Sequence, residues 1–159
     1  MELMFRPLRH YADFTGRSRR TEYWLFMLFK LIVYLVLWTI VVLTILDVDN
    51  AGEAQAWEER IKSGDFPFGV IISLLVLVIT WLFFFIPSLA VQIRRFHDQG
   101  MSGWLGLLNI PYYIPYLGTL VGLALLILMM LPGNNGPNLY GTDPKGGEGP
   151  DQGLRNVFN

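Results

Sequence analysis

Long apolar runs separated by short polar segments dominate this sequence. The first run covers residues 24–46 and is interrupted only by Lys30, Thr39 and Thr44. The second covers residues 68–91 and carries no charged side chain. At about 1.5 Å per residue, each run forms a helix of about 35 Å, which is long enough to cross a bilayer. The pattern therefore predicts an all-α membrane protein with two full transmembrane helices.

A third apolar region, residues 104–131, contains Pro111 and Pro115 within the sequence IPYYIPYLG. As one straight helix this region would be about 42 Å long and would have to tilt strongly. Breaking it at the prolines gives two shorter helices that form a hairpin or a re-entrant pair. The sequence favours this Pro-broken arrangement over one long third span.

Short polar segments flank the apolar runs. Pro7 is placed to open a short amphipathic helix, which either lies in the headgroup layer or is replaced by a flexible basic leader. Ser18 is a candidate N-cap for the first long helix. Residues 47–67 hold six acidic residues against two basic ones, and Trp57 and Ile61 predict a short interfacial helix there. The glycine- and proline-rich tail predicts turns as far as residue 144 and disorder beyond it.

A distinctive polar segment, RRFHDQG at residues 94–100, joins the second apolar run to the third. We expect the second helix to continue through it, with Gly100 as its C-cap and Ser102 capping the next helix. Arg94 and Asp98 stand four residues apart, which predicts a helical ion pair of about 0.3–0.5 kcal/mol. The simplest interpretation of this segment is a helix end with two arginines that set the membrane topology.

The distribution of basic residues predicts which segments face the cytoplasm. Five arginines lie in the first 22 residues and two in residues 94–100, whereas residues 47–67 are acidic. Because lysine and arginine accumulate on the cytoplasmic side, the N-terminus and residues 94–100 are predicted to lie there. A hairpin in the third region would return the tail to the cytoplasm, and a single span would leave it outside. We expect the first apolar run to be retained, since it is too long for a signal peptide.

The predicted organisation is a cytoplasmic basic leader over residues 1–22, a polytopic membrane domain over residues 23–144 and a disordered tail over residues 145–159. A formal net charge of −1 argues against nucleic-acid binding, and the absence of cysteine excludes disulfides and thiolate chemistry. With His10 and His97 as the two histidines, no metal site or cofactor is predicted. An enzyme is not favoured, because Asp98 is adjacent to His97 on a helix and points about 100° away from it.

A recognition surface is the sharper functional hypothesis. Arg94 and Arg95 can hold a phosphate or carboxylate, and the tail would close the site if it is cytoplasmic. The predicted partner is the bilayer through anionic lipid headgroups. A small anion, a protein partner or an oligomeric transporter or channel remain alternatives. The candidate recognition residues are Arg17, Arg20, Arg94, Arg95, His97, Asp98, Asn138 and Tyr140, and the candidate turn and cap residues are Gly16, Gly100, Ser102, Gly103, Trp104 and Gly141.

Three polar motifs together resemble a known family. We call them the first motif (FTGRSRRTEYW, residues 14–24), the central motif (RRFHDQGMSGWLGLL, residues 94–108) and the tail motif (PGNNGPNLYGTDP, residues 132–144). In this order, flanking apolar spans, they are similar to the bacterial "domain of unknown function 805" family of YhaH-like inner-membrane proteins. The resemblance covers roughly residues 11–144 and implies an inner-membrane location without an established activity.

The family pattern also implies which positions matter in each motif. Leu139 and the long IPYYIPYLG turn depart from that pattern. The matching positions are Gly16, Arg17, Arg20, Glu22, Tyr23, Trp24, Arg94, Arg95, His97, Asp98, Gly100, Ser102, Gly103, Trp104, Pro132, Gly133, Asn138, Tyr140, Gly141 and Pro144.

Overall fold

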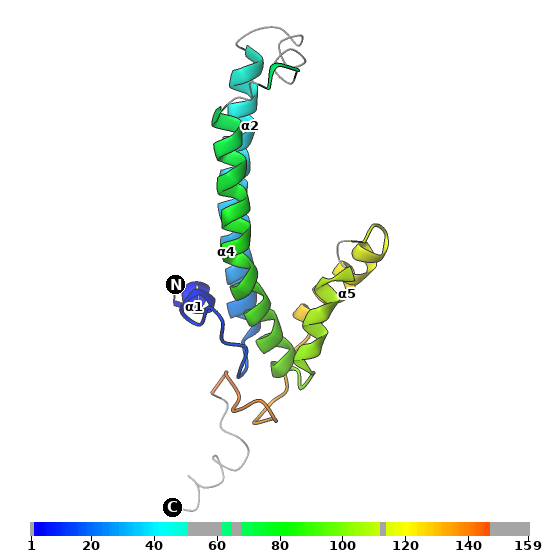
Figure 1. The fold of residues 1–159 in the computed structure, drawn as a ribbon. Coiled ribbons are helices and arrows are strands. Elements are labelled where there is room, and N and C mark those ends of the chain that lie inside the picture. Colours follow the sequence, from blue (N-terminus) through cyan, green and yellow to red (C-terminus); the bar gives the residue numbers. More distant parts are fainter. Residues whose placement is uncertain (1, 51–61, 65–67, 112–113, 147–159) are drawn as a thin grey trace, which may run out of the picture. The chain divides into compact units, whose positions relative to one another are not determined.

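The structure is a computed structural model that describes residues 2–50, 62–64, 68–111 and 114–146. These residues form five helices and no strand, which confirms the all-α fold class (Figure 1). The chain divides into two compact units, unit 1 with Met1–Met27 and Ile86–Asn159, and unit 2 with Leu28–Phe85. The helices are α1 (Glu2–Arg9), α2 (Arg20–Asn50), α4 (Phe68–Asp98), the 3-10 helix η1 (Gly103–Asn109) and α5 (Leu117–Met130).

Unit 2 is a pair of antiparallel helical segments from α2 and α4. The Phe84 ring makes edge-on contacts with Phe29 and Tyr34, at centroid distances of 5.9 and 6.2 Å. Towards the other end of the pair, the hydroxyls of Thr44 and Ser73 lie 3.4 Å apart. Contacts at both ends of the two segments therefore hold them side by side.

The remaining apolar surface of these helices faces outward. Arg20–Leu46 and Phe68–Asp98 are long and apolar enough to cross a membrane, and only 11% of the most apolar window of each is buried. The core helix of a water-soluble protein would be mostly buried, whereas Leu35 and Leu75 are 56% and 58% exposed. Exposed apolar surface of this extent is stable in lipid rather than in water. The prediction of two helices able to span a bilayer is confirmed.

Helix α4 continues into the central motif as far as Asp98 and ends as the sequence predicts. Gly100 adopts a left-handed conformation with φ +73°, which a residue with a side chain rarely adopts. The N–H of Met101 donates to Phe96 O at 2.9 Å and that of Gly100 donates to His97 O at 3.0 Å. This hydrogen-bond pattern is a Schellman C-cap, and Met101 packs against the buried cluster that contains Phe96. Ser102 caps η1 by accepting from the N–H of Trp104, as predicted.

Two predicted helix starts are wrong. Helix α1 begins at Glu2, so Pro7 lies inside it and is buried; in so short a helix the missing N–H costs a single hydrogen bond. Helix α2 begins at Arg20, so Ser18 is not its N-cap. Ser18 is instead fully buried, and its N–H donates to Arg94 O at 3.0 Å. The interfacial helix predicted around Trp57 and Ile61 lies outside the described residues, as does nearly all of the predicted disordered tail.

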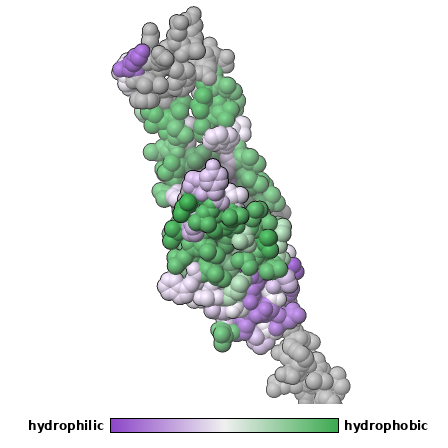
Figure 2. All heavy atoms as spheres, turned by 90° about the vertical axis from the view of Figure 1, so that its right-hand side faces the viewer, coloured by the Kyte–Doolittle hydropathy of each residue, from purple (hydrophilic) through white to green (hydrophobic). Residues whose placement is uncertain are grey.

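The third apolar region contributes η1, of seven residues, and α5, of fourteen. Phe96 from α4 packs with Leu125 and Met129 from α5 in a buried hydrophobic cluster of unit 1. In this unit, Figure 2 shows an apolar surface over α5 and hydrophilic side chains gathered where α5 ends and the tail begins. The fold thus positions its polar motifs at one end of unit 1.

Candidate functional site

The polar motifs meet at the C-terminal end of α4, inside unit 1. Burying charged groups is costly unless they are paired and hydrogen-bonded, so each of them requires a partner. We call the buried polar residues of this region the polar cluster. Its members are Arg17, Ser18, Glu22, Gln92, Arg94, Arg95, His97 and Asp98.

Asp98 is the central acceptor of the polar cluster and is only 3% exposed. Its carboxylate accepts from Arg17 Nε at 3.0 Å and forms an ion pair with Arg95, three residues before it on α4. The predicted Arg94–Asp98 pair is wrong, because Arg94 lies 3.5 Å from the Glu22 carboxylate instead. A carboxylate at a helix end can be reached from the i−3 as well as the i−4 position. Here Arg95 binds Asp98 from the i−3 position, and Arg17 binds it from the first motif.

Arg17 joins the end of α4 to the tail motif. Its two terminal nitrogens donate to the carbonyl oxygens of Asn134 and Gly136, each at 2.5 Å. The backbone adds another link, since the N–H of Asn134 donates to Asp98 O at 2.8 Å. The planar guanidinium with five donors in a fixed geometry suits this arrangement better than a lysine would. Arg17 therefore holds the tail motif against α4.

The close approach of the tail requires a glycine. A Cβ atom built on Gly133 would overlap the carboxylate of Asp98 and lie 3.0 Å from its backbone oxygen. No larger residue fits at this position without moving the carboxylate that the two arginines share.

Arginines from the first motif and the central motif cap the C-terminal carbonyls of α5. Arg95 donates to Leu131 O, and Arg20 donates to Met130 O at 3.3 Å. The last four carbonyls of a helix have no partner within it, and positive charge is favourable at its negative end. These bonds place the ends of α4 and α5 together.

Two contacts hold the His97 ring in one orientation, and a third binds its backbone carbonyl. Its Nδ1 lies 3.2 Å from Gly16 O, and because a carbonyl oxygen only accepts, we assign the proton to Nδ1. The ring stacks on Tyr140 at a centroid distance of 3.9 Å and an interplanar angle of 3°. Asn138 donates from its side chain to His97 O at 2.8 Å. The carboxylate of Asp98 is bonded to the arginines, so the geometry provides no His–Asp dyad.

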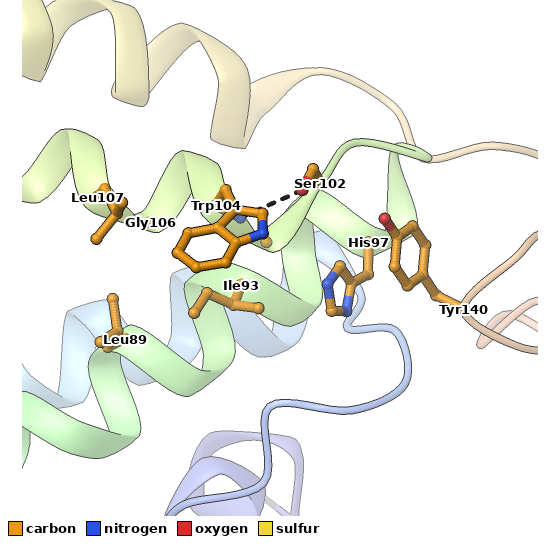
Figure 3. A pocket seen from close by; sticks show the side chains of 9 residues that line it. Leu89, Ile93, His97, Ser102, Trp104, Gly106, Leu107 and Tyr140 are labelled. Atoms are coloured by element: carbon orange, nitrogen blue, oxygen red, sulfur yellow. Dashed lines mark hydrogen bonds between the residues drawn. The ribbon is translucent and has the colours of Figure 1, made fainter.

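A pocket of about 450 Å³ lies beside His97 (Figure 3). Its walls are apolar apart from the imidazole, the Ser102 hydroxyl and the Tyr140 phenol. Among the described residues, no three His, Asp or Glu side chains are grouped closely enough to hold a metal ion. The residues that define the pocket are Leu89, Ile93 and His97 of α4, Trp104 and Leu107 of η1, and Tyr140 of the tail motif.

The structure brings together most of the predicted recognition residues but buries several of them. Arg17, Arg94 and Arg95 are at most 7% exposed. They are paired with carboxylates or carbonyls and do not form an open anion-binding surface. Among the residues of unit 1 that the structure describes, the exposed arginines are Arg6, Arg9 and Arg20; Arg19 is half-buried and donates to Pro144 O.

Gln99 and Asn134 have roles in the fold that the sequence pattern does not indicate. The Gln99 side chain donates to Leu128 O, and the Asn134 backbone makes the bonds described above. Asn134 uses only its backbone, and Gln99 binds a main-chain carbonyl 29 residues away, so the residue types in the sequence do not identify these bonds.

Outward-facing apolar helices with polar side chains gathered at the helix ends define an integral membrane protein of the helical class. The family model for proteins of unknown function DUF805 matches residues 11–142. The chain belongs to this family, as the three motifs predicted.

Two Escherichia coli (strain K12) proteins are similar to the chain over nearly its whole length. The inner membrane protein YhaI is 34% identical over 147 residues, which is 92% of this chain and 98% of the relative. The inner membrane protein YhaH is 31% identical over 145 residues, which is 91% of this chain and 98% of the relative. No solved structure matches the chain. These relatives confirm a bacterial inner-membrane location.

Proposed function

We propose that the three polar motifs face the cytoplasm and that the third apolar region enters and leaves the membrane on that side as a re-entrant hairpin. Helix α5 has 14 residues and is about 21 Å long, less than the ~30 Å hydrocarbon core. The seven residues of η1 rise about 14 Å. Neither element is long enough to cross alone, and the bonds from Arg20 and Arg95 join the end of α5 to the first and central motifs.

The cytoplasmic assignment rests on charge. The described part of unit 1 contains eight basic residues and five acidic ones, a formal excess of three positive charges. A reporter that is active only in the cytoplasm, fused after residue 159, is expected to be active. A reporter that works only outside the cytoplasm is expected to be active within residues 51–61. A C-terminal fusion active only outside would refute the hairpin.

We further propose that this end of the protein recognises anionic lipid headgroups. The observation that carries the proposal is that some arginines of unit 1 are buried and bound to the protein, whereas others are exposed. Arg17 and Arg95 are buried and hold the tail motif and the end of α5. Arg6, Arg9 and Arg20 are exposed, although Arg6 also lies 3.5 Å from the Glu22 carboxylate. A basic side chain near an anionic membrane surface contributes about 1 kcal/mol of attraction. The partner is therefore a negatively charged lipid surface rather than one small anion enclosed by the buried arginines.

The test is the enrichment of phosphatidylglycerol over phosphatidylethanolamine around the purified protein in mixed-lipid bilayers. Arg20→Gln removes a charge but keeps a donor for Met130 O, so it leaves the end of α5 capped. We expect it to lower the enrichment about fivefold, the factor that corresponds to about 1 kcal/mol. Lys62→Gln, at an exposed basic residue of the acidic loop, is the matched control and is expected to have no effect. If Arg20→Gln and Lys62→Gln lower the enrichment equally, the preference for anionic lipid reflects the total charge of the protein and not recognition at this end.

A further inference from the structure

The pocket beside His97 changes in polarity along its length. Helix α4 places Leu89, Ile93 and His97 four residues apart, on one face. The floor of the pocket therefore runs from an imidazole at the polar end of α4 to aliphatic side chains one and two turns further into the apolar helix. Trp104, at the mouth, is 78% exposed. Tryptophan is favoured at the boundary between headgroups and hydrocarbon.

The imidazole presents its second nitrogen to this pocket. The Nδ1–H is used by Gly16 O, and in the neutral ring this leaves Nε2 as a hydrogen-bond acceptor. Nε2 lies on the η1 side, 2.9 Å from the position that a Cβ on Gly103 would occupy. Figure 3 shows the ring between Tyr140 and the residues of η1. With His97 only 9% exposed, an acceptor fixed in this position is suited to one hydrogen-bond donor on a ligand.

None of the described residues that line the pocket has a charged side chain, but His97 also belongs to the polar cluster, and the formal charge of that cluster selects the kind of polar group. The polar cluster has three buried arginines and two carboxylates, a formal excess of one positive charge. This excess favours a phosphate and disfavours an ammonium group. A ligand that fits both the charge and the Nε2 acceptor carries a phosphate and a hydroxyl donor. A ligand that fits the aliphatic floor carries a hydrocarbon chain.

We propose that the pocket binds a single phospholipid with a glycerol headgroup, whose hydroxyl donates to His97 Nε2 and whose chain lies along Leu89, Ile93 and Leu107. A volume of about 450 Å³ is within the range of ligand sites and accommodates a headgroup and the first part of a chain. Tyr140 of the tail motif closes the polar end, so the tail forms part of the site. This inference rests on the proposed recognition of anionic lipid and adds a defined binding position to it.

The first test separates the hydroxyl from the charge. Binding of phosphatidylglycerol and of phosphatidic acid, which has the charge without the glycerol hydroxyls, is measured on the detergent-purified protein by native mass spectrometry. His97→Asn retains a donor near Gly16 O but removes the acceptor at Nε2. It is expected to weaken phosphatidylglycerol binding about two- to tenfold, the range for one lost hydrogen bond, without affecting phosphatidic acid. His97→Gln, which places an amide oxygen near the Nε2 position, is expected to retain binding. Unchanged phosphatidylglycerol binding by folded His97→Asn protein would overturn the proposal.

The second test fills the pocket. Leu107 in η1 and Leu123 in α5 are both 54% exposed, so tryptophan can be introduced at matched positions. Leu107→Trp is expected to abolish the single tight phosphatidylglycerol adduct, whereas Leu123→Trp is expected to retain it. If Leu107→Trp has no effect while Arg20→Gln still lowers anionic-lipid enrichment, the pocket proposal fails and the proposed function stands. If the protein shows no preference for anionic lipid at all, both fail.

Discussion

Neutralising Asp98 tests the central contact of the polar cluster. Asp98→Asn keeps the shape of the side chain and one acceptor oxygen but removes the negative charge that Arg17 and Arg95 share. Both arginine side chains are at most 1% exposed, so water cannot replace the lost carboxylate. The substitution leaves two buried cations without a counter-charge.

The expected cost follows from the burial of the pair. Removing one partner of a buried ion pair destabilises a protein by about 3–5 kcal/mol. The carbonyls of Asn134 and Leu131 still accept from Arg17 and Arg95 in the variant. We therefore expect a loss near the lower end of the range, about 3 kcal/mol in the free energy of unfolding. The loss is measured by reversible denaturant unfolding in mixed micelles.

A second substitution in the same background distinguishes stranded charge from a simple packing defect. Arg95→Met removes one of the two stranded cations, so the double variant Asp98→Asn/Arg95→Met is expected to be at least ~1 kcal/mol more stable than the sum of the single losses predicts. Asp13→Asn serves as the control, because the Asp13 side chain is 41% exposed, and it is expected to cost less than ~1 kcal/mol. Losses that add to within ~0.5 kcal/mol would refute the assignment of Asp98 as the shared counter-charge.

Three further changes test the attachment of the tail. Gly133→Ala places a methyl group in the space that the Asp98 carboxylate occupies. The substitution is expected to detach the tail, which is detected as faster proteolysis after residue 131. Tyr140→Ala removes the stacking on His97 and is expected to cost about 0.5–1.5 kcal/mol of unfolding free energy. Backbone hydrogen bonds, the largest contribution coming from Lys145, lower the pKa of Asp143. The stability of this turn is therefore complete above about pH 3.9, the pKa of an unfolded aspartate, and is lost as the pH falls through the lower folded-state pKa. The loss is detected as a smaller protection factor of the Lys145 amide, which compares its exchange with the intrinsic rate at the same pH.

Each of these changes has a matched control. Gly69→Ala adds the same methyl group to α4, where a Cβ meets nothing within 4 Å, and is expected to leave proteolysis of the tail unchanged. Tyr140→Phe keeps the ring and is expected to retain the stacking energy. Asp143→Asn has no titrating carboxylate and should remove the pH dependence of the protection factor of the Lys145 amide. If a test variant and its control give the same result in the assay, the contact removed by the test variant does not have the role assigned to it.

The elements that depend on local sequence were predictable. Hydrophobic runs of lipid length gave the two spans, and Gly100 and Ser102 marked the helix end and the next helix start, since caps depend on a few neighbouring residues. The start of α2 was not predictable in the same way. Ser18 has the chemistry of an N-cap, but its N–H is used by Arg94 O, a contact between residues distant in sequence.

The candidate site was predictable in its membership but not in its pairing. The motifs identified Arg17, Arg94, Arg95 and Asp98, yet the i,i+4 rule selected the wrong partner for Asp98. The correct pairing depends on a contact across 81 residues, which helical spacing cannot predict. Burial was also unpredictable, because an arginine beside an apolar run has the same sequence pattern whether it faces lipid headgroups or a carbonyl of the tail.

The bond between Arg17 and Asn134 constrains the order in which the molecule can be completed. The two residues are 117 positions apart, which corresponds to roughly 6–23 s of translation at about 5–20 residues per second. During that interval Arg17 has been synthesised, but the residues whose carbonyls accept its hydrogen bonds, Asn134 and Gly136, have not. The nascent chain must therefore keep this cation hydrated until the last segment emerges. Closure of the cluster is accordingly a late event, after both long helices have been made.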